Sequence, residues 1–203
     1  MSDFNTIEEA AQALNDGKIT IAEFQKVTYM QQKNFFLKDL MEARAAGDWS
    51  RFISRALSVY EVMPEAFSFY DEIPDSLKYD FAISAYIHHG DSIPAVRKAV
   101  RGAAKYGKAN LPADLRDQET ITIYRAGEED IGKCKYRISW TADLEVAKFF
   151  FYDYIGRHAA HLYKGQIKTS DIIAYNDERK EKEVMQYRKV FAIEEITDQK
   201  GTV

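Results

Sequence analysis

The sequence has few of the features that mark secreted or membrane-spanning proteins. Among its 203 residues there is a single cysteine, Cys134, so no internal disulfide can form. No apolar run approaches the ~20 residues that a transmembrane helix requires. The first residues also lack the basic start and the apolar stretch of a secretory signal. These absences predict a cytoplasmic protein that does not insert into a membrane.

Basic charge is not in excess either. The formal net charge of −4 argues against a protein that coats nucleic acid over its whole surface, although a local basic patch stays open. With 46% hydrophobic and 30% charged residues, the chain can bury a core and form one domain or two small ones. We find no glycine-rich phosphate loop and no internal repeat.

The pattern changes at about Leu111-Pro112, which divides the chain into a helical region, 1–111, and a second domain, 112–203. Apolar residues recur at helical spacing before this point, predicting helices over 6–14, 21–46, 48–62 and 74–87 and a last one beginning near 91. Short runs rich in Ile, Val and Tyr follow it, predicting strands over 120–125, 135–140, 160–168, 171–175, 183–187 and 190–193, with an aromatic helix over 144–151. Because no long crossover helices recur between these strands, we expect an α+β fold with antiparallel pairing.

The last predicted helix of the first region carries a basic stripe, made of Arg97, Arg101, Lys105 and Lys108. Two interpretations stay open. The stripe is a solvated helix face, as long basic side chains often form, or it contacts a phosphate-bearing partner such as RNA or DNA. We take Arg97 and Arg101 as candidate acceptor-binding residues.

Three polar residues occur in order beside predicted strands of the second domain. Arg125 ends the alternating run Thr120-Ile-Thr-Ile-Tyr-Arg125, Ser139 lies near the end of the next strand, and Glu183 follows Glu181-Lys at the start of a later one. An arginine presents a planar fork that binds phosphate oxygens in pairs. A carboxylate fixed beside a ribose stabilises the positive charge of an oxocarbenium-like transition state. This combination suits binding of NAD and cleavage of its N-glycosidic bond, because the cationic nicotinamide leaves without a metal.

The stretch from about Ile121 to Val184 resembles the Arg-Ser-Glu class of mono-ADP-ribosyltransferases, a toxin-like family also found in bacteria and their phages. Arg125 matches the strand-borne arginine, Ser139-Trp-Thr141 matches the Ser-x-Thr element, and Glu181-Lys-Glu183 matches the Glu-x-Glu element before a hydrophobic strand. The resemblance implies a split antiparallel β-sandwich whose two roughly perpendicular sheets line an NAD cleft.

The resemblance also implies a role for each matching residue. Glu183 would be the catalytic carboxylate, Ser139 would position it, and Glu181 would orient or deprotonate the acceptor. Arg125 would bind the phosphate or ribose of NAD, and the backbone at Ala126 would meet the nicotinamide amide. The other residues expected to contact NAD are Gly127, Trp140, Thr141, Phe150, Tyr154 and Arg157.

The resulting hypothesis is transfer of ADP-ribose from NAD to a macromolecular acceptor, either protein arginine or nucleic acid. A toxin or a phage factor that modifies its host, held in check by an inhibitory partner such as an antitoxin, is consistent with the resemblance. The alternatives are an NAD glycohydrolase and a noncatalytic helical adaptor with an inactive transferase-like domain. No metal is expected. A catalytic role for Cys134 would rest only on the flanking lysines, which could lower the pKa of its thiol.

Overall fold

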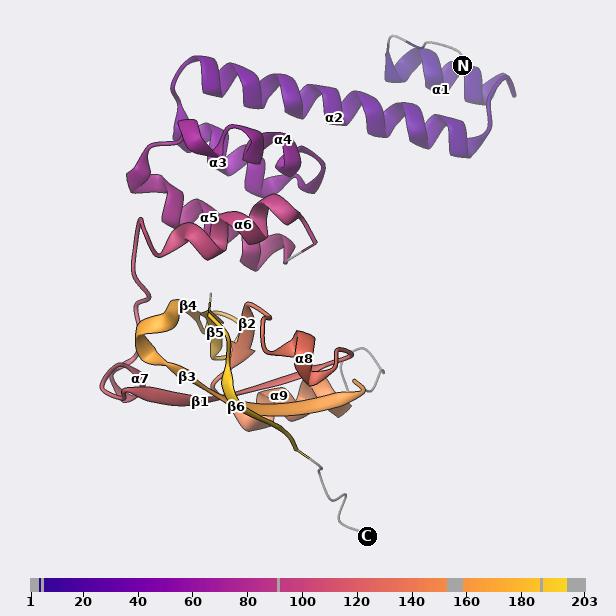
Figure 1. The fold of residues 1–203 in the computed structure, drawn as a ribbon. Coiled ribbons are helices and arrows are strands. Elements are labelled where there is room, and N and C mark those ends of the chain that lie inside the picture. The colour runs from indigo at the N-terminus through magenta and orange to yellow at the C-terminus, as the bar shows by residue number, and fades with distance from the viewer. Residues whose placement is uncertain (1–3, 5, 91, 153–158, 187, 197–203) are drawn as a thin grey trace. The chain divides into compact units, whose positions relative to one another are not determined.

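The computed structural model describes residues 4, 6–90, 92–152, 159–186 and 188–196. The chain divides into two compact units, Met1–Lys98 and Ala99–Val203. The first unit is helical and the second contains an antiparallel sheet (Figure 1). The α+β class expected from the sequence is therefore confirmed. No helix in the described part of the chain is long and apolar enough to cross a membrane.

The helical unit is built from helices joined by short turns. Its helices are α1 (Ile7–Asn15), α2 (Ile21–Ala45), α3 (Trp49–Ser58), α4 (Met63–Ser68) and α5 (Asp75–His89), and α6 (Pro94–Ala103) spans the division between the units. The helix expected over 48–62 is wrong in its last four residues. Val59 adopts an extended backbone that ends α3, and a short 3-10 turn, η1 (Tyr60–Val62), leads into α4. Pro64 lies in the first turn of α4, where its missing amide costs no hydrogen bond.

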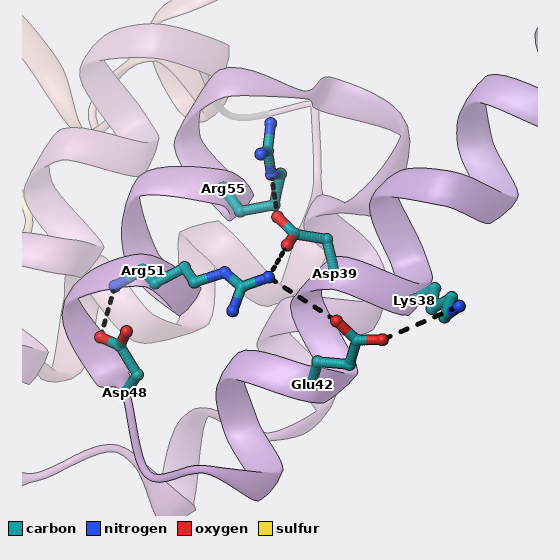
Figure 2. A network of polar contacts seen from close by, with 6 residues as sticks. All are labelled: Lys38, Asp39, Glu42, Asp48, Arg51 and Arg55. Carbon is teal, nitrogen blue, oxygen red and sulfur yellow. Dashed lines mark hydrogen bonds and ion pairs between the residues drawn. The ribbon is translucent and has the colours of Figure 1, made fainter.

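Polar caps begin helices α2 and α3, and ion pairs join the two helices. Thr20 and Glu23 form a reciprocal capping box at the start of α2. Further along α2, Asp39 accepts hydrogen bonds from both Arg51 and Arg55 of α3 (Figure 2). Asp48 caps α3 by accepting from the backbone amide of Arg51 at 3.0 Å. These charged contacts tie α3 to the C-terminal half of α2.

The second unit contains one open six-stranded sheet with the order β4-β5-β2-β1-β3-β6, in which all pairs are antiparallel. Its strands are β1 (Thr120–Gly127), β2 (Ser139–Thr141), β3 (His161–Lys168), β4 (Ile172–Asn176), β5 (Glu183–Gln186) and β6 (Phe191–Glu195). Strand β1 pairs with β3 along its whole length but meets β2 at a single register pair, Tyr124 with Thr141. The pairing of β1 with β2 is thus the shortest in the sheet.

Short helices connect and cover the strands. These are α7 (Ala113–Arg116), α8 (Ile131–Cys134), α9 (Leu144–Tyr152) and the 3-10 turn η3 (Thr169–Asp171). Helix α9 packs against β1, β2 and β3 (Figure 1). The strand expected over 135–140 is mostly wrong. Asp130 caps α8 instead, and turn hydrogen bonds continue to Arg137, so that only the three residues of β2 remain extended.

The core of the sheet unit takes side chains from β1, β2, β3, β4 and β5 and from segments beside them. It contains Leu111, Ile121, Ile123, Cys134, Trp140, Tyr163, Ile167, Ile172, Val184 and Val190. Alternation along each strand sends one set of side chains into this core and leaves its neighbours on the other face. That alternation determines which polar side chains reach the site described next.

Candidate active site

A pocket of about 620 Å³ opens beside the narrow junction of β1 and β2. This volume lies within the ~300–1,000 Å³ range of small-molecule sites. The pocket is lined by Tyr124, Arg125, Ala126, Gly127 and Glu128 of β1 and its end, by Ser139, Trp140 and Thr141 of β2, by Val146, Ala147, Phe150 and Ala159 in and after α9, and by Arg179, Glu181 and Glu183. The sheet unit therefore brings the arginine, the serine and both glutamates named from the sequence to one concavity.

Ser139 and Glu183 are joined directly. The register of β2 and β5 places Thr141 opposite Glu183 and Ser139 opposite Met185, so Ser139 and Glu183 are diagonal neighbours on one face. The Ser139 hydroxyl donates to Oε1 of Glu183 at 2.5 Å. Because the Glu183 side chain is only 9% exposed, this bond fixes the direction of a carboxylate that little solvent reaches.

Burial raises the pKa of Glu183. The hydrogen bond from Ser139 and the positive charge of Arg179 act against this effect, while the negative charge of Glu181 adds to it. A buried carboxylate in a polar pocket is typical of catalytic sites, where such shifts cluster. The hydrogen bond from Ser139 and the charge of Arg179 thus favour the charged form of Glu183.

Arg125 comes from the β1 side of the junction. Its Nη1 donates to the backbone carbonyl of Ser139 at 2.6 Å, so the guanidinium bridges β1 and β2 beyond their single register pair. Its Nε is buried and has no hydrogen-bond partner among the described residues. The guanidinium therefore ties the two strands together at the pocket wall, and its buried Nε is left without a hydrogen bond among the described residues.

The loop between β4 and β5 holds Glu181 in place. The Thr141 hydroxyl donates to the Glu181 carbonyl at 2.7 Å. Lys182, which has a positive φ of 44°, donates its amide to Oδ1 of Asp177 at 2.9 Å and pairs through Nζ with Asp143 at 2.8 Å. These bonds direct the Lys182 side chain to Asp143 and leave the flanking glutamates at the pocket.

Several pocket residues act through packing. Trp140 is 2% exposed, its ring belongs to the core, and its Nε1 donates to the Arg137 carbonyl at 3.1 Å. Gly127 lies close to Glu129, since a Cβ at position 127 would fall 2.5 Å from Oε2 of that side chain. Phe150 and Ala126 also line the pocket. The walls between the charged groups are thus apolar side chains and backbone.

Not every residue named from the sequence is found at the pocket. Arg97 and Arg101 are not among the pocket residues. The basic stripe is also shorter than expected, because α6 ends at Ala103 and the chain turns over residues 104–106 before Lys108. Tyr154 and Arg157 lie outside the described residues.

The lysines beside Cys134 do not lower the pKa of its thiol. Burial raises the pKa of Cys134 to about 11, and the side chain is fully buried in the core of the sheet unit. Such a thiol is a poor nucleophile because little thiolate forms at neutral pH.

Sequence reasoning missed Arg179. It lines the pocket, and its Nη2 lies 2.9 Å from Oε2 of Glu181. The only available signal was its place two residues before Glu181, inside the charged run that starts at Asp177. Charged runs are most often solvated loops, so the sequence did not separate this arginine from its neighbours.

Compared with models of known protein families, with curated proteins and with solved structures, the chain matches none.

Proposed function

We propose that this protein is a mono-ADP-ribosyltransferase, which transfers ADP-ribose from NAD to a macromolecular acceptor and releases nicotinamide. The observation that carries the proposal is the linked set of Arg125, Ser139 and Glu183 at one pocket, with Ser139 hydrogen-bonded through its hydroxyl to Glu183 and through its carbonyl to Arg125. These are the three residues on which the resemblance to the Arg-Ser-Glu transferases depends.

The arrangement suits cleavage of a cationic glycoside. Nicotinamide leaves NAD as a neutral molecule, and positive charge develops on the ribose. A carboxylate that accepts a hydrogen bond from the ribose 2′-hydroxyl stabilises that charge, most strongly where water is excluded. Glu183 meets this requirement because it is buried and already oriented by Ser139. Ser139 is therefore a positioning residue and Glu183 a catalytic residue.

The dinucleotide phosphates need a cation at the other side of the ribose. Arg125 offers a guanidinium with a buried Nε that no described residue satisfies. The backbone of Ala126 and Gly127 continues the same wall and supplies polar groups at close range, because Gly127 has no side chain. In the proposal this segment binds NAD, while Phe150 and the backbone of Trp140 flank it.

The division of the sheet at the junction of β1 and β2 supports the split β-sandwich that we propose. Strands β4, β5 and β2 carry Ser139 and Glu183, strands β1, β3 and β6 carry Arg125, and the halves meet at one register pair. A sheet that is continuous only there can diverge on either side of it, which would give the split sandwich of the transferases. The pocket beside this junction would be the NAD cleft.

Glu181 defines the acceptor side of the proposed site. A second carboxylate can hold a guanidinium by paired hydrogen bonds, which favours protein arginine as the acceptor. Arg97 and Arg101 stay candidates for binding a nucleic-acid acceptor. By the resemblance, the setting would be a toxin or a phage factor, with an antitoxin-like inhibitor as a further partner.

Nicotinamide release tests the proposal. The purified protein is incubated with NAD and cell extract, and released nicotinamide is measured for the wild type, for Glu183→Gln and for Glu178→Gln. Glu178 is an exposed residue of the same loop that does not line the pocket, so it is the matched control. We expect a loss of about 10²–10³-fold for Glu183→Gln, as for removal of one transition-state electrostatic partner, and no loss for Glu178→Gln.

The other outcomes separate the alternatives. Equal rates from the wild type and Glu183→Gln would remove Glu183 from the mechanism. Free ADP-ribose without a modified macromolecule would identify an NAD glycohydrolase. If the wild type released no nicotinamide in any extract, the helical adaptor would replace the transferase.

A further inference from the structure

Arg179 occupies the acceptor side of the pocket with its own guanidinium. Its Nη2 lies 2.9 Å from Oε2 of Glu181 and 3.8 Å from Oε2 of Glu183. The arginine side chain is 54% exposed, whereas those of Glu181 and Glu183 are 26% and 9% exposed. A solvent-accessible cation therefore reaches inward to two less exposed carboxylates.

The turn before β5 presents Arg179 in this position. The amide of Lys180 donates to the Asp177 carbonyl at 2.9 Å, and Lys180 has a positive φ of 58°. The Glu178 amide donates to Oδ1 of Asn176 at 3.2 Å. These bonds hold the backbone on both sides of Arg179, whose side chain reaches Glu181 and Glu183.

We propose that Arg179 is itself an acceptor, so that the protein attaches ADP-ribose to this side chain within the same molecule. The inference rests on the proposed transferase function and adds a modification site to it. The reacting group is a guanidinium, which is also the chemical class of external acceptor that the Glu181 side of the pocket would take.

The transfer balances with NAD as the only co-reactant. The bond between C1′ of the ribose and the nicotinamide nitrogen breaks, and nicotinamide leaves as a neutral molecule with the bonding electron pair. A bond forms between C1′ and a terminal nitrogen of Arg179, and the proton from that nitrogen passes to the Glu181 carboxylate. The Arg179–Glu181 contact thus joins the nucleophile to its base before NAD binds.

The contact with Glu183 gives the geometric argument. In the proposed mechanism Glu183 binds the 2′-hydroxyl, and C1′ is the carbon next to the one that bears this group. Nη2 of Arg179 lies 3.8 Å from Oε2 of Glu183, so the nucleophile stands beside the carboxylate that would hold the carbon next to C1′. Intramolecular placement of this kind removes the entropy cost of bringing an acceptor to the site.

A structural role makes a different prediction. If Arg179 only neutralises the two glutamates, it would stay unmodified whenever NAD is cleaved. Modification would instead leave ADP-ribose covalently attached to this side chain. Whether Arg179 carries ADP-ribose therefore distinguishes a structural role from a role as acceptor.

Peptide mapping by mass spectrometry tests the inference on the full chain. Wild type, Arg179→Lys, Arg116→Lys and Glu183→Gln are each incubated with NAD alone, and nicotinamide is measured in the same samples. Arg116 is an exposed arginine of the same unit that does not line the pocket. We expect one ADP-ribosyl group on the peptide containing Arg179 in the wild type and in Arg116→Lys, and none at position 179 in the other two variants.

Two further measurements establish that the reaction is intramolecular. The first-order rate constant of modification should not change over a tenfold range of protein concentration. A tagged Glu183→Gln protein mixed with the wild type should stay unmodified at Arg179. A rate constant that rises with concentration, or a labelled Glu183→Gln partner, would overturn transfer within one molecule.

The failures of the two proposals are distinguishable. Nicotinamide release that depends on Glu183, with an unmodified Arg179 peptide, overturns the self-acceptor inference and leaves the transferase. No nicotinamide release with NAD alone or with any acceptor source overturns the transferase, and the inference falls with it.

Discussion

Replacing Ser139 by alanine isolates the contact on which the site depends. The substitution removes the hydroxyl that donates to Glu183 at 2.5 Å and leaves the Ser139 backbone, including the carbonyl that Arg125 binds. Neither the pairing of β2 with β5 nor the pocket wall needs the hydroxyl. Any loss of activity in Ser139→Ala is therefore a loss of control over one carboxylate.

The structure gives the size of the effect. A hydrogen bond to a charged group contributes about 1.5–3 kcal/mol, and each 1.36 kcal/mol in a barrier is a factor of ten. Ser139→Ala should thus lower kcat/KM for nicotinamide release by roughly 10- to 150-fold. Ser170→Ala, which changes an exposed serine outside the pocket, should not alter it.

The pH profile adds a readout that a general loss of folding would not produce. Burial raises the pKa of Glu183, and the Ser139 hydrogen bond opposes this. Activity requires the carboxylate, so it should fall as the pH drops through this raised pKa, and the acid limb of kcat/KM should lie above the usual range of glutamate. In Ser139→Ala the limb should move to still higher pH. An unchanged rate and an unchanged limb would refute the role given to this contact.

Three other substitutions test separate parts of the account. Arg125→Lys, which loses the planar fork, should lower kcat/KM at least about tenfold, mainly through KM for NAD. Trp140→Ala should lower the unfolding free energy in urea by about 3–5 kcal/mol, because the ring is buried. Asp39→Asn should lower the Tm at neutral pH and less so in acid. Arg51 and then Arg55 lower the pKa of Asp39, so its contribution is present above the unfolded pKa and lost as pH falls through the folded one.

The strands of the sheet unit could be predicted because their side-chain pattern is local. Strands β1, β3, β4, β5 and β6 lie within two residues of the expected ranges. The aromatic helix α9 was also expected, but its large side chains are less buried than the sequence suggests, since Phe149 is 54% exposed and only Ala147 of the helix is fully buried. The failure over 135–140 has a local cause too, because the cap at Asp130 starts α8 there, and strand propensity does not register a competing cap.

The helical region shows where periodicity is insufficient. A continuous helical pattern over 48–62 does not reveal that Val59 breaks the helix and that Pro64 opens a new one. The basic stripe failed for a similar reason, because glycines at positions 102 and 107 lower helix propensity just where the stripe was extended. In both cases the apolar spacing continued through the break.

The sequence was sufficient to predict which residues form the site. It did not specify the strand register and the hydrogen bonds that join them. The order of Arg125, Ser139 and Glu183 beside strands was visible in the sequence. The diagonal register that joins Ser139 to Glu183 depends on strand pairing, which no local pattern specifies. The contacts of Arg179 with Glu181 and Glu183 depend on how the loop folds, which the charged run in the sequence does not specify.

A crystal structure of the Glu183→Gln variant with NAD tests the central claim most directly. The variant keeps the shape of the side chain and should hold uncleaved dinucleotide. The account predicts the nicotinamide ribose against position 183, with its 2′-hydroxyl in hydrogen-bond range, and the phosphates or the adjoining ribose against Arg125. Dinucleotide bound outside the pocket between β1 and β2, or no bound dinucleotide at saturating NAD, would contradict it.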